Sequence, residues 1–259
     1  MNITLFTKNS LRHNYLINSL SKICNNLYVI SENFSFEERV KKEILQSTIK
    51  KNYFEKVNDA EKKVFNFTLS PGNNIKKLEL NYDELSNLNL DKITDYLDSD
   101  YFIIFGSSYI KNDLIDLLVK KKAVNIHMGI SPYYRGSDCN FWALYDDNSD
   151  LVGATIHLIS KGLDSGPILY HVVSDIKEEI YTYSMSCVKA SIDSLVLKLK
   201  NKNLNLENTI VQNKSYQIRY TKKNDFSEDA ISKFLDKNIN LKKKVDLNRL
   251  INPFILKKL

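Results

Sequence analysis

Glycine, proline and cysteine are all scarce in this chain. Its 259 residues include only 7 Gly, 4 Pro and 3 Cys. So few glycines and prolines exclude a collagen-like or low-complexity protein. The cysteines Cys24, Cys139 and Cys187 are odd in number and far apart, which argues against a disulfide framework and a cysteine-based zinc site. We therefore expect free thiols in a reducing compartment and no bound metal.

Long apolar runs and blocks of one charge are also missing. No run approaches the roughly 20 apolar residues that span a bilayer, and the opening MNITLFTKNSLRHNYL turns polar too early for a signal peptide. The net charge of +6 is spread over interspersed Lys and Glu, with short basic runs such as 242–244. This distribution favours a solvated surface over a nucleic-acid-binding face. We expect a cytoplasmic protein that binds neither membranes nor nucleic acid.

The apolar residues that are present form short runs separated by helical patterns. Strand signals lie at 3–7, 27–31, 78–82, 101–106, 123–127, 153–160 and 168–174, and helical patterns at 11–23, within 36–67, and at 90–97, 111–122 and 181–200. The opening strand, helix and strand predict parallel pairing through a right-handed crossover. We therefore predict an α/β fold with a doubly wound, mostly parallel sheet in residues 1–200. Residues 201–259 should form a short C-terminal extension with a strand at 216–220 and a helix near 227–235.

Most of the few glycines gather in one part of the chain. Six of the seven lie between Gly106 and Gly166. Glycine permits tight turns and close backbone approach, and ligands of open α/β sheets bind beyond the carboxyl ends of the strands. Gly106, Gly129 and Gly162 each follow an expected strand, so we predict that their three loops border one cleft.

Asn125, His127 and Asp164 are the candidate reactive residues of that cleft. Asn125 and His127 lie two apart on a strand and therefore share a face, and Asp164 lies on the turn after the next strand. Together they would supply an oxyanion donor, a proton acceptor and a group that orients the imidazole. An isolated Asn-x-His pair is more often an ordinary strand end. His157 and His171 are expected to be packed or hydrogen-bonded strand residues.

Three longer segments resemble the core of the folate-dependent formyltransferases. They are NIH at 125–127, the segment from Ser131-Pro132 through Tyr134-Arg135-Gly136 to Trp142-Ala-Leu, and GATIHLISKGLDSGPIL at 153–169. The resemblance implies a Rossmann-like formyltransferase fold, 10-formyltetrahydrofolate as the formyl donor, an amine acceptor and the catalytic trio Asn125, His127 and Asp164. Relatives commonly have Ser-Leu-Leu-Pro where this chain has Gly-Ile-Ser-Pro at 129–132, a departure expected to affect only fine acceptor contacts.

The resemblance also implies where the donor binds. Its pterin would lie along the loop after the 101–106 strand and beside the 160–164 turn. The donor-binding candidates are Gly106, Ser107, Ser108, Tyr109, Ile110, Ser160 and Gly162.

The identity of the acceptor is narrowed by comparison with the family's branches. Only 58 residues follow Asn201, too few for the tRNA-gripping β-barrel of methionyl-tRNA formyltransferases. The 8–14 loop lacks the glycines of glycinamide ribonucleotide enzymes. This loop, the 36–67 segment and the short tail are similar to sugar N-formyltransferases, which formylate nucleotide-linked amino-dideoxysugars for surface polysaccharides such as O-antigen. We therefore expect a homodimer acting on a GDP- or dTDP-linked aminosugar.

Two groups of residues are candidates for binding that acceptor. Lys8, Arg12 and His13 could meet the pyrophosphate, because Lys and Arg pair well with phosphate oxygens, or they could simply begin a solvated helix. Tyr133, Tyr134 and Arg135 could line the sugar pocket, and Arg135 could equally anchor its own loop. The alternatives are a methionyl-tRNA or glycinamide ribonucleotide formyltransferase, a catalytically silent nucleotide-sugar or folate binder, and an RNA-binding protein.

Overall fold

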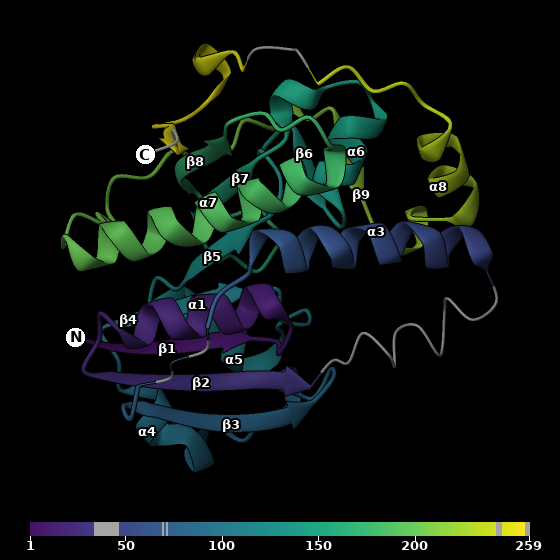
Figure 1. The fold of residues 1–259 in the computed structure, drawn as a ribbon. Coiled ribbons are helices and arrows are strands. Elements are labelled where there is room, and N and C mark those ends of the chain that lie inside the picture. The colour runs from purple at the N-terminus through teal and green to yellow at the C-terminus, as the bar shows by residue number, and fades with distance from the viewer. Residues whose placement is uncertain (34–46, 69, 71, 242–244, 257–259) are drawn as a thin grey trace.

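A single large sheet forms the centre of the molecule. The computed structural model describes residues 1–33, 47–68, 70, 72–241 and 245–256. Eight strands lie in the order β10-β8-β7-β5-β4-β1-β2-β3 (Figure 1). They are β1 (Asn2–Thr7), β2 (Asn26–Asn33), β3 (Ile75–Asn81), β4 (Tyr101–Phe105), β5 (Val124–His127), β7 (Ala154–Leu158), β8 (Ile168–Ser174) and β10 (Phe254–Leu256). Only β7 runs antiparallel to its neighbours among these strands.

Both faces of the sheet are covered by helices, as a doubly wound fold requires. Alternate residues of one strand point to opposite faces, and in β4 Ile103 and Phe105 join one apolar cluster while Phe102 and Ile104 join the other. The first cluster includes side chains of α1 (Leu11–Ser21) and α7 (Ile180–Lys200). The second is closed by α4 (Thr94–Leu97) and α5 (Asn112–Lys120). The predicted fold class is confirmed.

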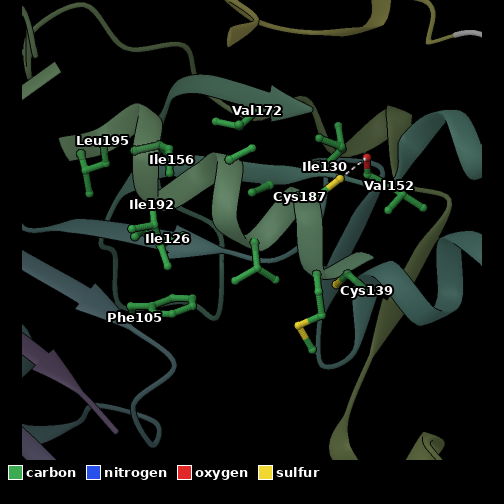
Figure 2. Packing of buried hydrophobic residues seen from close by; sticks show 14 of the residues in the cluster. Phe105, Ile126, Ile130, Cys139, Val152, Ile156, Val172, Cys187, Ile192 and Leu195 are labelled. Carbon is green, nitrogen blue, oxygen red and sulfur yellow. Dashed lines mark hydrogen bonds between the residues drawn. The ribbon is translucent and has the colours of Figure 1, made fainter. Parts of the chain in front are cut away.

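Helix α7 fixes the strands that carry the candidate reactive residues. Figure 2 shows Ile192 and Leu195 of α7 beside Ile126 of β5 and Ile156 of β7, all of them buried. Burying one such side chain stabilises the fold by about 1.5 to 3 kcal/mol. Because Ile126 lies between Asn125 and His127, this packing also sets the direction in which those two side chains point.

Helix α3 (Thr48–Val64) accounts for the described part of the long helical pattern at 36–67. Residues 36–46 of that pattern lie outside the described residues. The Ser47 hydroxyl accepts a hydrogen bond from the amide of Lys50 and caps the helix. Helix α3 packs against α1, α7 and α8 (Glu228–Leu235). It therefore connects α1, near the start of the chain, with α7 and α8 of the later part of the chain (Figure 1).

The segment after Asn201 folds back onto the rest of the chain. β9 (Arg219–Thr221) pairs in parallel with β6 (Tyr134–Gly136), and β10 extends the main sheet beside β8. The strand expected at 216–220 begins later, because Lys214–Tyr216 forms a short 3-10 turn capped by Asn213. The helix expected near 227–235 is α8.

Helix α6 (Cys139–Tyr145) follows β6 and packs against it. None of the helices in the described ranges is both long enough and apolar enough to cross a bilayer.

Candidate active site

The three predicted reactive residues meet at the carboxyl end of β5. The Nδ1 atom of His127 lies 3.4 Å from Oδ1 of Asp164. The amide of Asn125 donates to the same oxygen over 3.5 Å, at the limit of a hydrogen bond. Asn125 and His127 are 9% and 6% exposed. The structure therefore brings an amide, an imidazole and a carboxylate to one buried point.

The turn that carries Asp164 is held from behind by two side chains. Arg135 donates from Nε to the carbonyl of Asp164 over 3.2 Å and from Nη2 to the carbonyl of Leu163 over 2.8 Å. Gln212 donates to the carbonyls of Asp164 and Gly166, each over 2.8 Å. Arg135 thus anchors the turn that carries Asp164, and not its own loop as one of its predicted roles had it.

His157, for which the sequence predicts a packed or hydrogen-bonded strand residue, is a fourth member of the cluster. Its Nδ1 donates to the carbonyl of Leu158 over 2.7 Å, so its Nε2 is free to accept from the amide of Asn125 at 3.0 Å. Asn125 and His157 are direct partners in the antiparallel pairing of β5 with β7. The alternation of the 154–158 strand was the available signal, but only the register places His157 opposite Asn125.

Burial and charge set the protonation states of the site. Burial lowers the pKa of His127, although the Asp164 carboxylate partly offsets it. Burial alone would raise the pKa of Asp164, but the nearby imidazoles of His127 and His157 outweigh it and lower the net pKa. A neutral imidazole therefore lies beside an ionised carboxylate. A protonated His127 would face Asp164 with Nδ1 and could donate from Nε2 to the carbonyl of Tyr134 at 3.3 Å.

A cavity of about 770 Å³ begins at the imidazole of His127. Its walls come from residues 8–14, α3, α6 and the first turns of α7, and Phe234 of α8 closes one side. Lys8, Arg12 and His13 all line it. This is large enough for a small-molecule ligand, since typical pockets measure roughly 300 to 1,000 Å³.

The positive charge of residues 8–14, the end of a loop and the first turn of α1, is smaller than the sequence indicates. Arg12 pairs with Glu61 of α3 at 3.1 Å, and Glu61 also accepts from the Arg12 amide and the Ser10 hydroxyl. His13 is buried, and burial, with smaller contributions from Arg12 and Lys8, lowers its pKa well below the ordinary value. Glu61 lies 49 residues from Arg12 and has no local sequence signature that could have revealed this role.

Tyr133 and Tyr134 lie elsewhere than expected. Neither is among the described residues that line the cavity. The hydroxyl of Tyr134 is buried with Asn148 and Asp146, and that of Tyr133 donates to the carbonyl of Arg249. Their aromatic rings support the loop rather than face the ligand space.

The two loops predicted to hold the folate donor face each other. The hydroxyl of Tyr109 donates to the carbonyl of Lys161 over 3.0 Å. Ser160 donates to the carbonyl of Gly162 within the opposite turn. Gly106 adopts φ +67°, and a Cβ there would lie 2.6 Å from Nε2 of His13. Ser107 donates from its hydroxyl to the carbonyl of Ser108, and Ile110 is buried.

No group of three His, Cys, Asp or Glu side chains suited to a metal ion occurs in the described part of the chain.

This chain is similar in sequence and in structure to known formyltransferases. Among curated proteins, the methionyl-tRNA formyltransferase of Finegoldia magna is 33% identical over 101 residues, which cover 36% of this chain and 32% of that protein. The match therefore spans about a third of that relative. An N-formyltransferase from Helicobacter canadensis, solved with folinic acid and dTDP-3-aminofucose, has a TM-score of 0.50 and 15% identity over 87% of this chain and 72% of its own.

A phosphoribosylglycinamide formyltransferase from Anaplasma phagocytophilum is equally similar in structure, with a TM-score of 0.50 and 16% identity over 86% of this chain and 97% of its own. At these identities the structural likeness shows the fold alone. The family model described as formyl transferase matches residues 4–194, a range that contains Asn125, His127 and Asp164. This chain belongs to the formyl transferase family.

Proposed function

We propose that this protein transfers the formyl group of 10-formyltetrahydrofolate to the amino group of a nucleotide-linked amino-dideoxysugar. The observation that carries the proposal is the meeting of Asn125, His127 and Asp164 beside a cavity of about 770 Å³. An amide donor, a neutral imidazole and a carboxylate are the groups that acyl transfer to an amine requires.

The proposed reaction forms a bond between the amine nitrogen and the formyl carbon and breaks the bond from that carbon to the folate nitrogen. Asn125 donates to the oxyanion of the tetrahedral intermediate in place of its long 3.5 Å contact with Asp164. Such a donor contributes about 10²- to 10³-fold in rate. His157, which accepts from the same amide, holds Asn125 in position.

His127 accepts the proton that the attacking amine loses, a contribution of about 10²- to 10⁴-fold for general base catalysis. Asp164 then stabilises the imidazolium, and the carbonyl of Tyr134 accepts its second N–H. Neutral His127 has a single N–H and can donate to only one of these two acceptors, so both are satisfied only after His127 gains its proton. The proton finally leaves with the tetrahydrofolate amine.

Family membership and the paired loops at 106–110 and 160–162 support a folate donor. The Helicobacter canadensis enzyme was solved with folinic acid, a formylated folate of the same chemical class as the proposed donor. In this chain the Asp164 turn directly follows Gly162, so a donor lying along that turn would reach the reactive residues.

The shape and lining of the cavity support a small acceptor. Phe234 of α8 closes it and Tyr53 of α3 contributes an aromatic wall, while Lys8 supplies positive charge beside the paired Arg12 and Glu61. A sugar with a phosphate-bearing tail suits such a mixture. The resemblance to sugar N-formyltransferases supports a role of the product in surface polysaccharide synthesis.

The test is to incubate the protein with 10-formyltetrahydrofolate and GDP-, dTDP- and UDP-linked aminosugars and to follow the gain of one formyl mass. We expect one sugar to be formylated and His127→Ala to abolish the transfer. Formylation of methionyl-tRNA or glycinamide ribonucleotide alone, or release of formate with no acceptor, would contradict the proposal. Binding of the nucleotide sugar with no transfer would identify a silent binder.

A further inference from the structure

Two residues that line the cavity beside His127 each have a buried polar atom without a partner. Among the described residues, the Nδ2 amide of Asn140 and the hydroxyl of Tyr181 make no hydrogen bond. Both residues line the cavity and are only 6% and 9% exposed. Buried polar groups in folded proteins nearly always have partners, because an unmade hydrogen bond costs free energy. Two such groups in one cavity therefore indicate ligand atoms.

The other polar atoms of these residues are already used. The Oδ1 atom of Asn140 accepts from the amide of Gly153 over 3.0 Å, which fixes the side chain and leaves Nδ2 as its only unused polar atom. Tyr181 begins α7, and its backbone amide is capped by the Glu179 carboxylate at 2.8 Å. Burial and Glu179 raise the pKa of Tyr181 to about 12, so its hydroxyl keeps a proton to donate.

The surroundings decide what kind of ligand group fits. The ring of Tyr181 lies 5.5 Å from that of Tyr53, which in turn lies 5.7 Å from that of Phe141. The cations that line the cavity, such as Lys8, Arg12 and Lys62, come from the 8–14 loop and the end of α3. Aromatic surroundings with one amide donor and one hydroxyl suit a neutral oxygen on a ring better than a charged phosphate.

We infer that Asn140 and Tyr181 form a specificity subsite that recognises a neutral oxygen substituent, a hydroxyl or an amide carbonyl, on the sugar ring of the acceptor. This inference rests on the proposed function and adds to it which part of the acceptor the cavity recognises. The acceptor would extend from its amine at His127 to its ring substituent at α6 and α7. Its charged tail would lie toward the 8–14 loop.

The decisive variant is Tyr181→Phe, which removes only the unpartnered oxygen. We expect the KM for the formylated nucleotide aminosugar to rise roughly 3- to 10-fold, the loss of one hydrogen bond, while the KM for 10-formyltetrahydrofolate stays the same. The melting temperature should stay the same or rise, because no hydrogen bond within the protein is lost. Asn140→Asp, which keeps an oxygen for Gly153 but removes the amide donor, should also raise the acceptor KM.

Tyr183→Phe is the matched control on the same helix. Its hydroxyl donates to the carbonyl of Ser149 over 3.2 Å and lies outside the cavity lining. This variant should lower the melting temperature and leave the acceptor KM unchanged. An acceptor analogue that lacks the recognised oxygen should bind wild type and Tyr181→Phe equally.

The outcomes separate this inference from the proposed function. Transfer to a nucleotide aminosugar with the same acceptor KM in wild type, Tyr181→Phe and Asn140→Asp would overturn the subsite and leave the function standing. Transfer only to glycinamide ribonucleotide or methionyl-tRNA would overturn the function, and the same KM comparison on that amine would then decide the subsite. Transfer to no amine would overturn both.

Discussion

Asp164 shows how much of the site depends on the placement of one side chain. It adopts φ +45°, a left-handed conformation that aspartate tolerates better than most residues. Arg135 and Gln212 hold its carbonyl, so its carboxylate is directed toward His127. Arg135 and Gln212 thus fix the backbone on one side of the turn, and the Asp164 carboxylate points to His127 on the other side.

Replacing Asp164 by Asn should keep the shape of the turn and remove the charge. Asp164 raises the pKa of His127 against the larger effect of burial, so its loss should lower that pKa further. The acid limb of kcat/KM against pH should therefore move to lower pH, while the maximum falls about 10²- to 10⁴-fold. A pH–rate profile measures both. An acid limb that stays in place would show that Asp164 does not act on His127.

Gly129 makes room for the same imidazole. A Cβ at this position would lie 2.5 Å from Cβ of Cys139 and 2.8 Å from Nε2 of His127. Gly129→Ala should therefore displace His127, with a loss of at least about 10-fold in kcat, and should destabilise the fold by about 1 to 3 kcal/mol through overpacking. Gly72→Ala, whose new methyl would meet the Asn74 side chain far from the site, is the control for activity. Activity within twofold of wild type in Gly129→Ala would contradict the packing argument.

The meeting of Asn125, His127 and Asp164 could be predicted from sequence because a strand period and a glycine-flanked turn are local signals and because three segments resemble the formyltransferases. His157 and Glu61 could not. The role of His157 depends on the register of β5 against β7, and that of Glu61 on a contact between α3 and the start of α1. Both depend on packing between segments far apart in the chain.

At the scale of elements, the donor loop after β4 is tied to the end of β2. The Glu32 carboxylate, which is fully buried, accepts from the amide and the hydroxyl of Ser108, each over 2.6 Å, and from the amide of Asp83 over 2.9 Å. A buried carboxylate is tolerated only when it is well supplied with donors. These three bonds supply them and fix the loop that we expect to face the folate.

Glu32→Ala should loosen this loop, because two backbone amides lose their partner. We expect the KM for 10-formyltetrahydrofolate to rise about 10-fold. The free energy of unfolding should fall by about 3 kcal/mol, the upper end of the values for a hydrogen bond to a charged group. Acceptor KM should change little. Initial-rate kinetics with each substrate varied in turn, beside a melting curve, give both quantities.

Glu79→Ala, an exposed carboxylate on β3, is the control for removing a glutamate. It should leave both KM values and the stability unchanged. A Glu32→Ala protein with lowered stability and an unchanged donor KM would show that Glu32 supports the fold and not the loop's function.

For the molecule as a whole, the histidines share one property. All four histidines of the chain, His13, His127, His157 and His171, are buried. His171 donates from Nε2 to the carbonyl of Ser131 and accepts at Nδ1 from the amide of Ile251, which requires the neutral ring. Burial lowers its pKa from 6.5 to about 4. Between pH 6.5 and pH 4, His171 is therefore protonated in the unfolded chain and neutral in the folded protein.

This difference predicts loss of stability in mild acid. A folded-state pKa below the unfolded value means that stability is full above pH 6.5 and falls as the pH approaches 4. His171 alone should cost about 3 kcal/mol over this window, and His127 and His13 change in the same direction. Urea unfolding between pH 8 and pH 4 measures the effect. His171→Gln should flatten the curve, and an equally steep curve in that variant would contradict the assignment.

The positions of most strands and helices of the main sheet were predictable, since each has its own periodic pattern, but the order of the strands across the sheet was not. The pairings of β6 with β9 and of β10 with β8 were not, because they join segments more than 80 residues apart. A strand of three residues has too short a hydrophobic pattern to predict which strand it pairs with.

The pairing of β6 with β9 limits how the C-terminal tail can be exchanged between related proteins. Gly136 adopts φ +93°, and a methyl group there would lie 1.9 Å from the carbonyl oxygen of Thr221, so the 131–136 loop and the tail fit closely against each other. A chimera that grafted the tail of another formyl transferase onto residues 4–194 would change the loop that ends at Gly136. Tail and core must therefore be inherited, or exchanged, as one unit.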